Sequence, residues 1–433
     1  MKSAKINVVW IVPIVLLGAL LRCAGFWMPH DEPRELLYTT LAMRLDEAGS
    51  FEYNLKSVGI KHLSFKSDPN VWLTYPVEAS PVPGDVRLAE SILGEDVLDL
   101  PLFYEPPYFS MSLVMAHRWL AELKQPYTII QTSVSADKKC KPQARFFKFQ
   151  FWAVFISFAA SVLTLLATYF LASRLWGAST GLLSAIFLAV CPSDVMNAMR
   201  ITPESVFTLI MVLTFWVLWE ALQRKSAWGC FWAGILYAMT LLTKLEAWFF
   251  LPAAVGMIAI TQKELSSDKS VRYTCFLNWK MACFFLGAYF ISGHRFWHMH
   301  EVYGNPFFIG PYLERTVAAV SPKSWLMIIA SWPVLLFCLA LIKSGKKEKP
   351  LLLLGLWALP LIIFYAVTGQ LGKPELLSAV LPALAMLAAR GVTQLKESLS
   401  TRRDRTLVMP ALGSVVVLMS LLSLWALWIG VFA

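Results

Sequence analysis

The sequence predicts an all-helical protein that crosses a membrane many times. Of its 433 residues, 57% are hydrophobic and only 15% are charged, and the mean hydropathy is +0.58, whereas a soluble domain carries roughly 25% charged residues. Long apolar runs recur along the chain, and basic residues fall mainly on alternate connections between these runs. The composition excludes an ordinary water-soluble globule, a disordered chain, collagen and a coiled coil.

About eleven apolar runs approach the roughly 20 residues that a membrane-spanning helix needs. The first run resembles a signal peptide, but no small-residue cleavage site follows it and Arg22 before Cys23 does not fit a lipoprotein-type site, so we expect an uncleaved anchor. The runs lie near 7–27, 149–173, 178–196, 203–222, 227–243, 246–262, 273–293, 325–342, 351–368, 375–390 and 407–431.

The basic residues predict the orientation. With the N-terminus in the cytoplasm, the cytoplasmic side carries 18 Lys and Arg residues, whereas the short outer connections carry six. This asymmetry follows the positive-inside rule. We expect a bacterial inner-membrane protein with a cytoplasmic N-terminus and periplasmic outer loops, and we attribute its net charge of +10 to contact with anionic lipid rather than nucleic acid. The six outer cations are Arg200, Lys244, Arg295, Arg315, Lys323 and Lys373.

The largest connection, residues 28–148, is predicted to lie outside, and it holds 16 of the 28 acidic residues. A loop this long is usually functional, and turn signals such as Asp68-Pro69-Asn70 recur in it. Residues 33–48 and 107–120 have apolar positions at helical spacing, which fits either helices on the membrane surface or the core helices of a folded cap. In the second stretch these positions are Tyr108, Met111, Met115 and Trp119.

Several classes of site have no motif in this chain. Seven cysteines without a CxxC pair indicate neither a disulfide framework nor a zinc site. Neither GxGxxG nor GxxxxGK[ST] occurs, so direct use of ATP is not expected. His294, His298 and Glu301 have roughly helical spacing, and a divalent metal there is the weaker alternative to a solvated loop.

Ionisable residues gather where the runs meet the outer face, and a charge at a bilayer edge needs a reason. Asp31 and Glu32 fit either a carboxylate that takes a proton from an acceptor hydroxyl or a cap for a helix that begins at Pro33. Glu204, with Arg200 close by in sequence, fits either the first turn of a helix or a second acid beside a cation.

Two further groups have the same two interpretations. Lys244 and Glu246 fit an interface pair or a part of the site, and Arg295 fits a solvated loop or a ligand contact. Carboxylates beside several cations suit a substrate that has both a phosphate and a hydroxyl. The cations would hold the phosphate and stabilise its charge as it leaves, so no metal ion is strictly required.

These residues stand in motifs that resemble those of the GT-C glycosyltransferases, which use polyprenyl-phosphate sugars. The closest group is the bacterial relatives of the protein O-mannosyltransferases and of the lipid A aminoarabinose transferase. The matching segments follow the family's order over residues 8–395. They are Asp31-Glu32-Pro33-Arg34-Glu35-Leu36-Leu37-Tyr38, Tyr104-Glu105-Pro106-Pro107-Tyr108-Phe109, Arg174-Leu175-Trp176-Gly177, Arg200-Ile201-Thr202-Pro203-Glu204, Leu242-Thr243-Lys244, Tyr303-Gly304-Asn305-Pro306-Phe307-Phe308 and Leu381-Pro382-Ala383-Leu384-Ala385.

The resemblance implies a GT-C-type fold, and the apolar runs give it about 11 transmembrane helices. Residues 1–270 would form the catalytic membrane module, which includes the outer loop 28–148. Residues 271–433 would add C-terminal transmembrane helices and an outer loop over 294–324. The implied activity is transfer of one sugar, with inversion, from an undecaprenyl- or dolichyl-phosphate carrier to a hydroxyl of a lipid, glycan or protein.

The resemblance also implies roles for single residues. Asp31 would accept the proton with Glu32 beside it, and Glu204 would be the second acid. Glu105 stands where relatives commonly carry Lys or His, so it is expected, with Tyr108, to face the acceptor. Lys373 stands where relatives commonly have an arginine. The donor phosphate would be held by Arg200, Lys244, Arg295 and Lys373.

Two other functions stay open at this stage. A transporter or flippase for a lipid-linked glycan would favour charged or broken helices at mid-membrane, often in repeats, whereas the acids here cluster at loop junctions. A non-catalytic subunit with a GT-C fold is the second alternative, and Glu105 at a position where a cation is common keeps it open.

Overall fold

The computed structural model describes a mainly helical protein with one two-stranded sheet among the described residues. The chain divides into two compact units: unit 1 comprises Met1–Met28, Ser157–Gly293 and Thr316–Ala433, and unit 2 comprises Pro29–Ile156 and His294–Arg315. The described residues are 8–27, 35, 38, 42, 62–68, 71–76, 107–120, 147–265, 279–303, 348–367, 374–398, 414, 417, 418 and 421.

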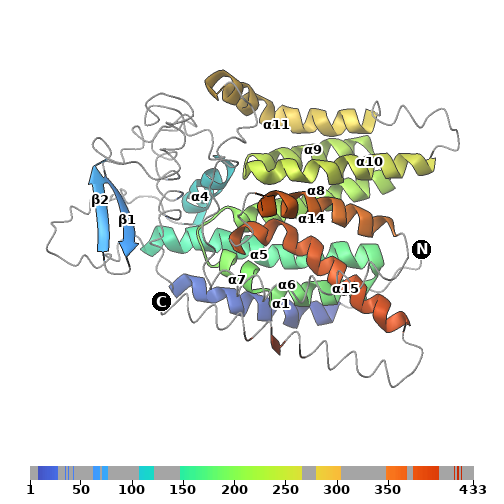
Figure 1. Ribbon diagram of the computed structural model, residues 1–433, viewed down its shortest axis with the longest axis horizontal. Helices are drawn as coiled ribbons and strands as arrows, with labels where there is room; N and C mark the ends of the chain where they lie inside the picture. Colours follow the sequence, from blue (N-terminus) through green and yellow to red (C-terminus); the bar gives the residue numbers. More distant parts are fainter. Residues whose placement is uncertain are drawn as a thin grey trace. The chain divides into compact units, whose positions relative to one another are not determined.

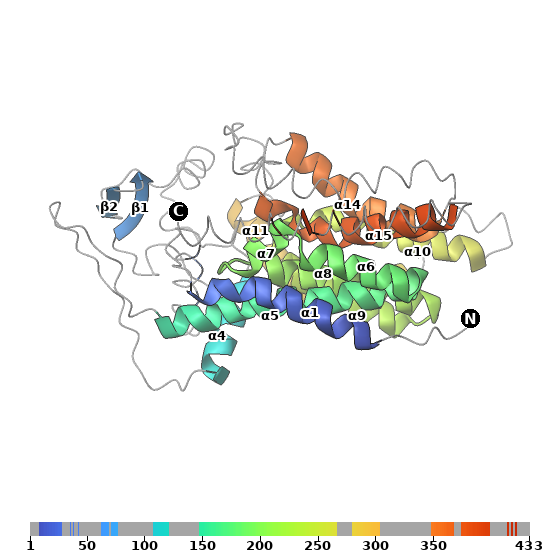
Figure 2. The same cartoon turned by 90° about the horizontal axis from the view of Figure 1, so that it is seen from below.

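Unit 1 is a helical bundle. Its helices α1, α5, α8, α9 and α10 run along a common direction in both ribbon views (Figures 1 and 2). Helices α5 and α11 also extend into unit 2. The helical elements are α1 (Val8–Arg22), η1 (Cys23–Trp27), α5 (Phe147–Trp176), α6 (Ala178–Ala189), α7 (Pro192–Ala198), α8 (Glu204–Gln223), α9 (Ala227–Leu241), η3 (Leu245–Phe250), α10 (Leu251–Leu265), α11 (Trp279–Tyr303), α14 (Lys349–Val367), η6 (Pro374–Val380) and α15 (Leu381–Ser398).

Four described segments are long and apolar enough to cross a membrane, and α6 with α7 gives a fifth if the bent pair is one span. The chain is therefore an integral, multi-pass membrane protein, but the described part does not reach the predicted number of about eleven spans. The predicted run near 325–342 lies outside the described residues, as does nearly all of the run near 407–431. The four segments are Trp10–Trp27, Trp152–Trp176, Glu204–Gln223 and Leu377–Glu397.

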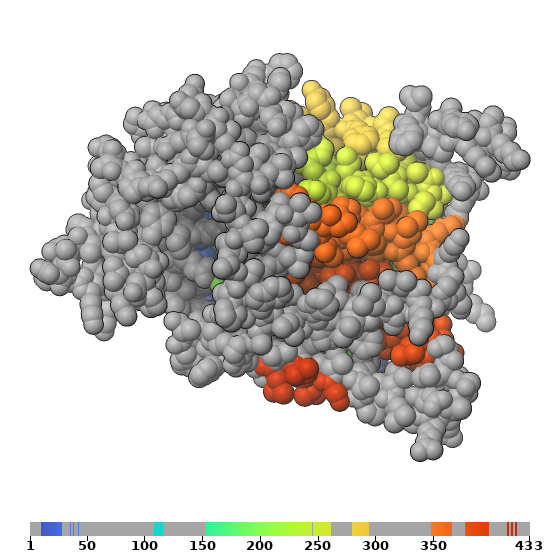
Figure 3. All heavy atoms as spheres, viewed as in Figure 1, coloured from blue at the N-terminus to red at the C-terminus, as the bar shows by residue number. Residues whose placement is uncertain are grey.

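The surface of the bundle agrees with a membrane environment. Helices α11 and α14 expose large apolar side chains, and Figure 3 shows the outer surfaces of both, α11 in yellow and α14 in orange. A soluble monomer rarely exposes an apolar patch larger than a few hundred Å², whereas lipid covers such side chains in a membrane protein. The exposed residues include Leu286, Tyr289, Phe290, Leu352, Leu359 and Ile363.

The segment 178–196, predicted as one span, is broken in the structure. Helices α6 and α7 meet at an angle of 64°. Pro192 occupies the first position of α7 and Cys191 before it is extended, because proline has no backbone N–H and disfavours helical geometry in the residue before it. The break places the short helix α7 next to the connection that leads into α8.

Aromatic rings form the centre of the bundle between α8, η3 and α14. Trp357 is 1% exposed and stacks on Phe215 at a centroid distance of 5.4 Å, with Phe250 edge-on at 5.8 Å. Its indole nitrogen donates to Met211 Sδ at 2.9 Å. Aromatic pairs of this kind add about 0.5–1.5 kcal/mol each beyond their buried area, so this cluster holds the three elements together.

Polar side chains gather at the end of the bundle where α5 finishes. Glu348 accepts hydrogen bonds from Trp176 Nε1 at 2.8 Å and from Arg390 Nη2 at 2.6 Å. Arg174, close to Trp176 on α5, contacts Glu220 at 2.8 Å. Three cations from connections predicted to share one side, Arg174, Arg224 and Arg390, therefore lie at one end of unit 1.

Unit 2 contains a hairpin and part of the predicted outer helices. Strands β1 (His62–Asp68) and β2 (Val71–Pro76) pair antiparallel, with His62 opposite Pro76. The predicted turn Asp68-Pro69-Asn70 joins the two strands.

Helix α4 (Pro107–Leu120) has the bounds of the second predicted outer helix. Phe109, Leu113 and Val114 are its buried apolar residues among those described, and Phe109 meets Tyr38 edge-on at 5.2 Å. Met115, on the face predicted to be apolar, is 53% exposed. This packing favours the interpretation of α4 as a core helix of a folded cap.

Candidate functional site

A cluster of three buried charges lies where α8 begins and α9 ends. Lys244 Nζ is 3.3 Å from Oε1 of Glu204 and 3.4 Å from Oε1 of Glu246. The three side chains are at most 10% exposed. The structure therefore brings together Glu204 and Lys244, two residues that the sequence analysis assigns to the site, and adds Glu246 to them.

The local sequence explains where each of these side chains lies. Pro203 precedes α8, and Glu204 occupies the first turn of the helix, as predicted, where the N-terminal dipole favours a negative charge. Helix α9 ends at Leu241, and the extended residue Lys244 precedes the 3-10 helix η3, which carries Glu246 in its first turn. Two helix starts thus present carboxylates to one lysine.

The electrostatics of this cluster are unusual for a membrane protein. Lys244 contacts two carboxylates in a nearly water-free environment, and buried charge is expensive unless it is paired. Lys244 Nζ also lies 5.9 Å from the centroid of the Phe207 ring, a cation–π distance.

Uncompensated polar atoms surround the cluster. Thr202 Oγ1, Ser205 Oγ and Glu246 Oε2 are buried and make no hydrogen bond to the described residues. Buried polar atoms are normally hydrogen-bonded, so these atoms could accept a hydrogen bond from, or donate one to, a bound ligand.

Arg200 lies in the connection between α7 and α8 and is half-buried. Its backbone N–H donates to the carbonyl of Asn197 at 3.3 Å. Two residues further on, the carbonyl of Thr202 accepts a hydrogen bond from Ser157 on α5 at 3.3 Å. The connection that carries Arg200 and leads into Glu204 is therefore held by its own turn and by α5.

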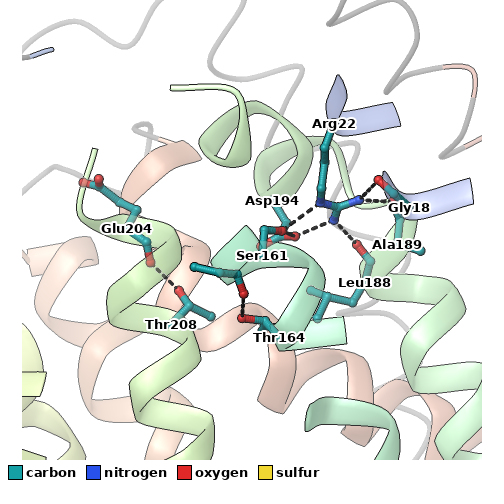
Figure 4. A network of polar contacts seen from close by, with 10 residues as sticks. Gly18, Arg22, Ser161, Thr164, Leu188, Ala189, Asp194, Glu204 and Thr208 are labelled. Carbon is teal, nitrogen blue, oxygen red and sulfur yellow. Dashed lines mark hydrogen bonds and ion pairs between the residues drawn. The ribbon is translucent and has the colours of Figure 1, made fainter. Parts of the chain in front are cut away.

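A second buried network was not found by the sequence analysis. Arg22, at the end of α1, is fully buried and pairs with Asp194 on α7 at 2.5 Å. Ser161 on α5 donates to the same carboxylate oxygen at 2.8 Å. Figure 4 shows Arg22 pointing toward Asp194, Ser161 and the end of α6. The available signal was the presence of two charged residues inside predicted spans, which marks a functional hypothesis by default.

Among the remaining predicted site residues, only Tyr108 has a side chain that the structure describes. Tyr108 is half-buried on α4, and burial raises the pKa of its phenol above the ordinary value. Arg295 lies on α11, but its side chain is outside the described part. The remaining candidates, which also lie outside the described residues, are Asp31, Glu32, Glu105 and Lys373.

The alternative metal site is also untested. His294, His298 and Glu301 are on α11, and their side chains are not among those described. Within the described part of the chain, no group of three His, Cys, Asp or Glu side chains could hold a metal ion.

The charge cluster lies in a segment of the chain, here called the family segment, that matches a known protein family. Residues 143–287 match the family described as dolichyl-phosphate-mannose-protein mannosyltransferase. This segment contains Glu204, Lys244 and Glu246. An uncharacterised protein of Aquifex aeolicus (strain VF5) is 26% identical over 273 residues, which cover 60% of this chain and 52% of that protein. The chain thus matches about half the length of this relative.

Two solved structures resemble the whole chain. ArnT from Cupriavidus metallidurans, bound to undecaprenyl phosphate, has a TM-score of 0.58 and 13% identity over 98% of this chain and 77% of that chain. The archaeal oligosaccharyltransferase AglB from Archaeoglobus fulgidus, in complex with an inhibitory peptide and a dolichol-phosphate, has a TM-score of 0.51 and 12% identity over 96% and 55%. The resemblance inferred from the motifs is confirmed: residues 143–287 match the family described as dolichyl-phosphate-mannose-protein mannosyltransferase, and the chain shares its fold with ArnT and AglB.

Proposed function

We propose that this protein transfers a sugar from a polyprenyl-phosphate carrier to a hydroxyl of a lipid, glycan or protein. The observation that supports this function most directly is the buried Glu204–Lys244–Glu246 cluster within the family segment of a GT-C fold. The ligands named for the similar structures, undecaprenyl phosphate and dolichol-phosphate, support a lipid phosphate as the leaving group here.

The proposed reaction is a single displacement at the anomeric carbon. The acceptor oxygen forms a bond to that carbon while the bond from the carbon to the phosphate oxygen breaks, and the lipid phosphate leaves with the electron pair. The hydroxyl proton passes to a carboxylate, for which Asp31 with Glu32 beside it is our candidate. Attack from the face opposite the leaving group inverts the anomeric configuration.

The cluster contributes to this reaction through charge. Lys244 contacts both carboxylates, so it holds Glu204 in place as the second acid. We assign the phosphate itself to several cations, namely Lys244 together with Arg200, Arg295 and Lys373. Glu105 and Tyr108 are proposed to face the acceptor.

The proposed location follows the distribution of cations. Arg174, Arg224 and Arg390 lie at one end of the bundle, whereas Arg200 and Lys244 lie at the end where α8 begins. The positive-inside rule supports a cytoplasmic position for the first group. We therefore propose a periplasmic site in a bacterial inner membrane, formed by the catalytic module 1–270 and completed by 271–433.

The test measures sugar transfer in detergent by the wild type and by a variant that lacks one carboxylate. Purified protein is incubated with polyprenyl-phosphate sugars and an envelope extract from a deletion strain, and mass spectrometry identifies the acceptor that gains a sugar. Asp31→Asn keeps the shape and removes the base, so transfer should fall by about 10²–10⁴-fold. Asp137→Asn, in the same outer loop, is the control and should leave transfer unchanged.

Each alternative function has its own outcome. Transfer in detergent, where no compartments exist, excludes a function limited to flipping. Binding of undecaprenyl phosphate without any transfer would instead support the non-catalytic subunit. Turnover of Asp31→Asn within a few-fold of the wild type would exclude Asp31 as the base.

A further inference from the structure

The buried Arg22–Asp194 pair lies beside the path of the chain into Glu204. We infer that Arg22 and Asp194 are positioning residues that hold the connection from α7 to α8 and thereby fix Glu204 in the site. This inference rests on the proposed function, because it assigns the pair a role in the same reaction.

The contacts of Arg22 specify one arrangement of the helices around it. The guanidinium has five N–H donors, and each makes a hydrogen bond in the structure. Nε donates to Ser161 Oγ at 2.7 Å, and Nη2 donates to Asp194 Oδ2 at 2.5 Å. The other three bonds reach backbone carbonyls: Nη1 donates to Gly18 at 2.8 Å and Ala189 at 2.9 Å, and Nη2 donates to Leu188 at 3.1 Å.

These bonds act on the break between α6 and α7. Leu188 and Ala189 are the last two residues of α6, where carbonyls lack partners within the helix and a positive charge is favoured. Asp194 lies in the first turn of α7. One side chain thus joins both sides of the 64° break to α1 and, through Ser161, to α5.

From Asp194 the chain runs through a buried segment to Glu204. Gly25 packs against Met199, and a Cβ atom on Gly25 would lie 2.6 Å from Met199 Cα. Further along, Ser157 holds the carbonyl of Thr202. Because the connection is held by α1, η1 and α5 and is almost entirely buried, a shift of Asp194 must be passed on toward Glu204.

The coupling between Asp194 and Glu204 matters for the reaction because it fixes the geometry of the site. A buried ion pair is weak evidence for stability, since a well-packed apolar pair often serves as well. What the ion pair contributes is a fixed geometry, because a planar guanidinium whose donors are all hydrogen-bonded permits little movement. A misplacement of about 1 Å far from the chemistry can cost 10²-fold in rate.

The test compares this pair with a second ion pair on the far side of the same bundle. Asp194→Asn keeps the shape and removes the charge, and Arg22→Lys keeps the charge and removes the planar fork. The control is Glu348→Gln, which weakens the contact with Arg390. Hydrogen exchange followed by mass spectrometry in detergent measures backbone opening over 195–208, and steady-state transfer gives kcat and the donor KM.

We expect Asp194→Asn to speed exchange over 195–208 by about tenfold or more, with smaller changes elsewhere. Its kcat should fall by about 10²-fold while the donor KM stays within about twofold. Arg22→Lys should also lower kcat, because the three donors of an ammonium cannot replace the five hydrogen bonds of the guanidinium. Glu348→Gln should change neither the exchange over 195–208 nor kcat.

Two results would overturn the inference. One is uniform acceleration of exchange in Asp194→Asn, which would show a general loss of stability. The other is local acceleration with unchanged kcat, which would show that the connection does not position the site. If the wild type transfers no sugar, the proposed function fails; the assigned role in the reaction then falls with it, and the exchange experiment still decides whether the pair holds the connection.

Discussion

The middle of α5, at Ser161, and its C-terminal end, at Trp176, lie near polar clusters of opposite character. Near Ser161, the pairs Arg22–Asp194 and Lys244–Glu204 are at most 10% exposed at every side chain. Near Trp176, the Arg174 side chain is 49% exposed and its partner Glu220 is 18% exposed. Fifteen residues separate Ser161 from Trp176, which is about 22 Å along a helix.

Ordinary surface electrostatics explains the exposed ion pairs, whereas the buried ion pairs need another explanation. Exposed pairs form at little cost and contribute about 0–1 kcal/mol. Buried pairs lose several kcal/mol of hydration per ion, and Lys244 contacts two buried carboxylates. Such an arrangement fits charges that act on a substrate or fix a reactive geometry, so the proposed chemistry is assigned to the buried pairs and not to the pairs near Trp176.

The largest expected difference is in the rate of sugar transfer, and it compares two variants of helix α8. Glu204→Gln and Glu220→Gln are the same substitution at opposite ends of α8. Loss of Glu204 should lower the transfer rate by about 10²–10⁴-fold, the usual contribution of a positioned acid or base. Loss of Glu220 should change it by less than about twofold, because its partners are exposed.

Steady-state assays on purified variants, with thermal unfolding to check folding, measure this difference. Equal losses in the two variants would contradict the contrast between the ends. So would a folded Glu204→Gln variant with wild-type turnover.

The next difference concerns stability. Arg22→Met leaves Asp194 buried without its cation, which should cost roughly 3–5 kcal/mol. Arg390→Met leaves Glu348, whose side chain is 21% exposed, and should cost about 1 kcal/mol. Unfolding of both variants in mixed micelles with increasing denaturing detergent gives the two values, and a smaller loss for Arg22→Met would mean that water reaches Asp194.

A smaller difference concerns two glycines. In Gly25→Ala the new Cβ meets the Met199 backbone, and such overpacking costs about 1–3 kcal/mol. In Gly355→Ala on α14 the Cβ meets nothing within 4 Å, so removal of a helical glycine should stabilise by about 0.4–1 kcal/mol. Thermal unfolding should therefore shift in opposite directions, and a neutral Gly25→Ala would show that η1 can move away from α7.

Local sequence rules predicted much of this fold. The position of Glu204 in the first turn of α8 and the bounds of α4 followed from proline and helical spacing. The break between α6 and α7 was not predicted, although Pro192 indicates it. Hydropathy predicts the run 178–196 as one span, and hydropathy does not show where a helix bends.

The candidate site was only partly predictable. Motifs shared with one family assigned Lys244 and Glu204 to one site, whereas their direct contact was not predicted. The Arg22–Asp194 pair was not expected, because its partners are 172 positions apart in the chain. Only the packing of α1 against α6 and α7 reveals that contact.

The smallest expected difference concerns pH at the Trp176 end. The hydrogen bond from Arg390 is the largest of several contacts that hold the pKa of Glu348 below its ordinary value of 4.5. A carboxyl whose pKa is lowered by folding stabilises the protein above its unfolded pKa, and this contribution disappears as the pH falls through the folded pKa. Wild type should therefore be more stable than Glu348→Gln at neutral pH, and the gap should narrow below about pH 4.5. Thermal unfolding of both proteins between neutral and acidic pH measures the gap, and a gap that stays constant into acid would mean that Glu348 contributes through packing alone.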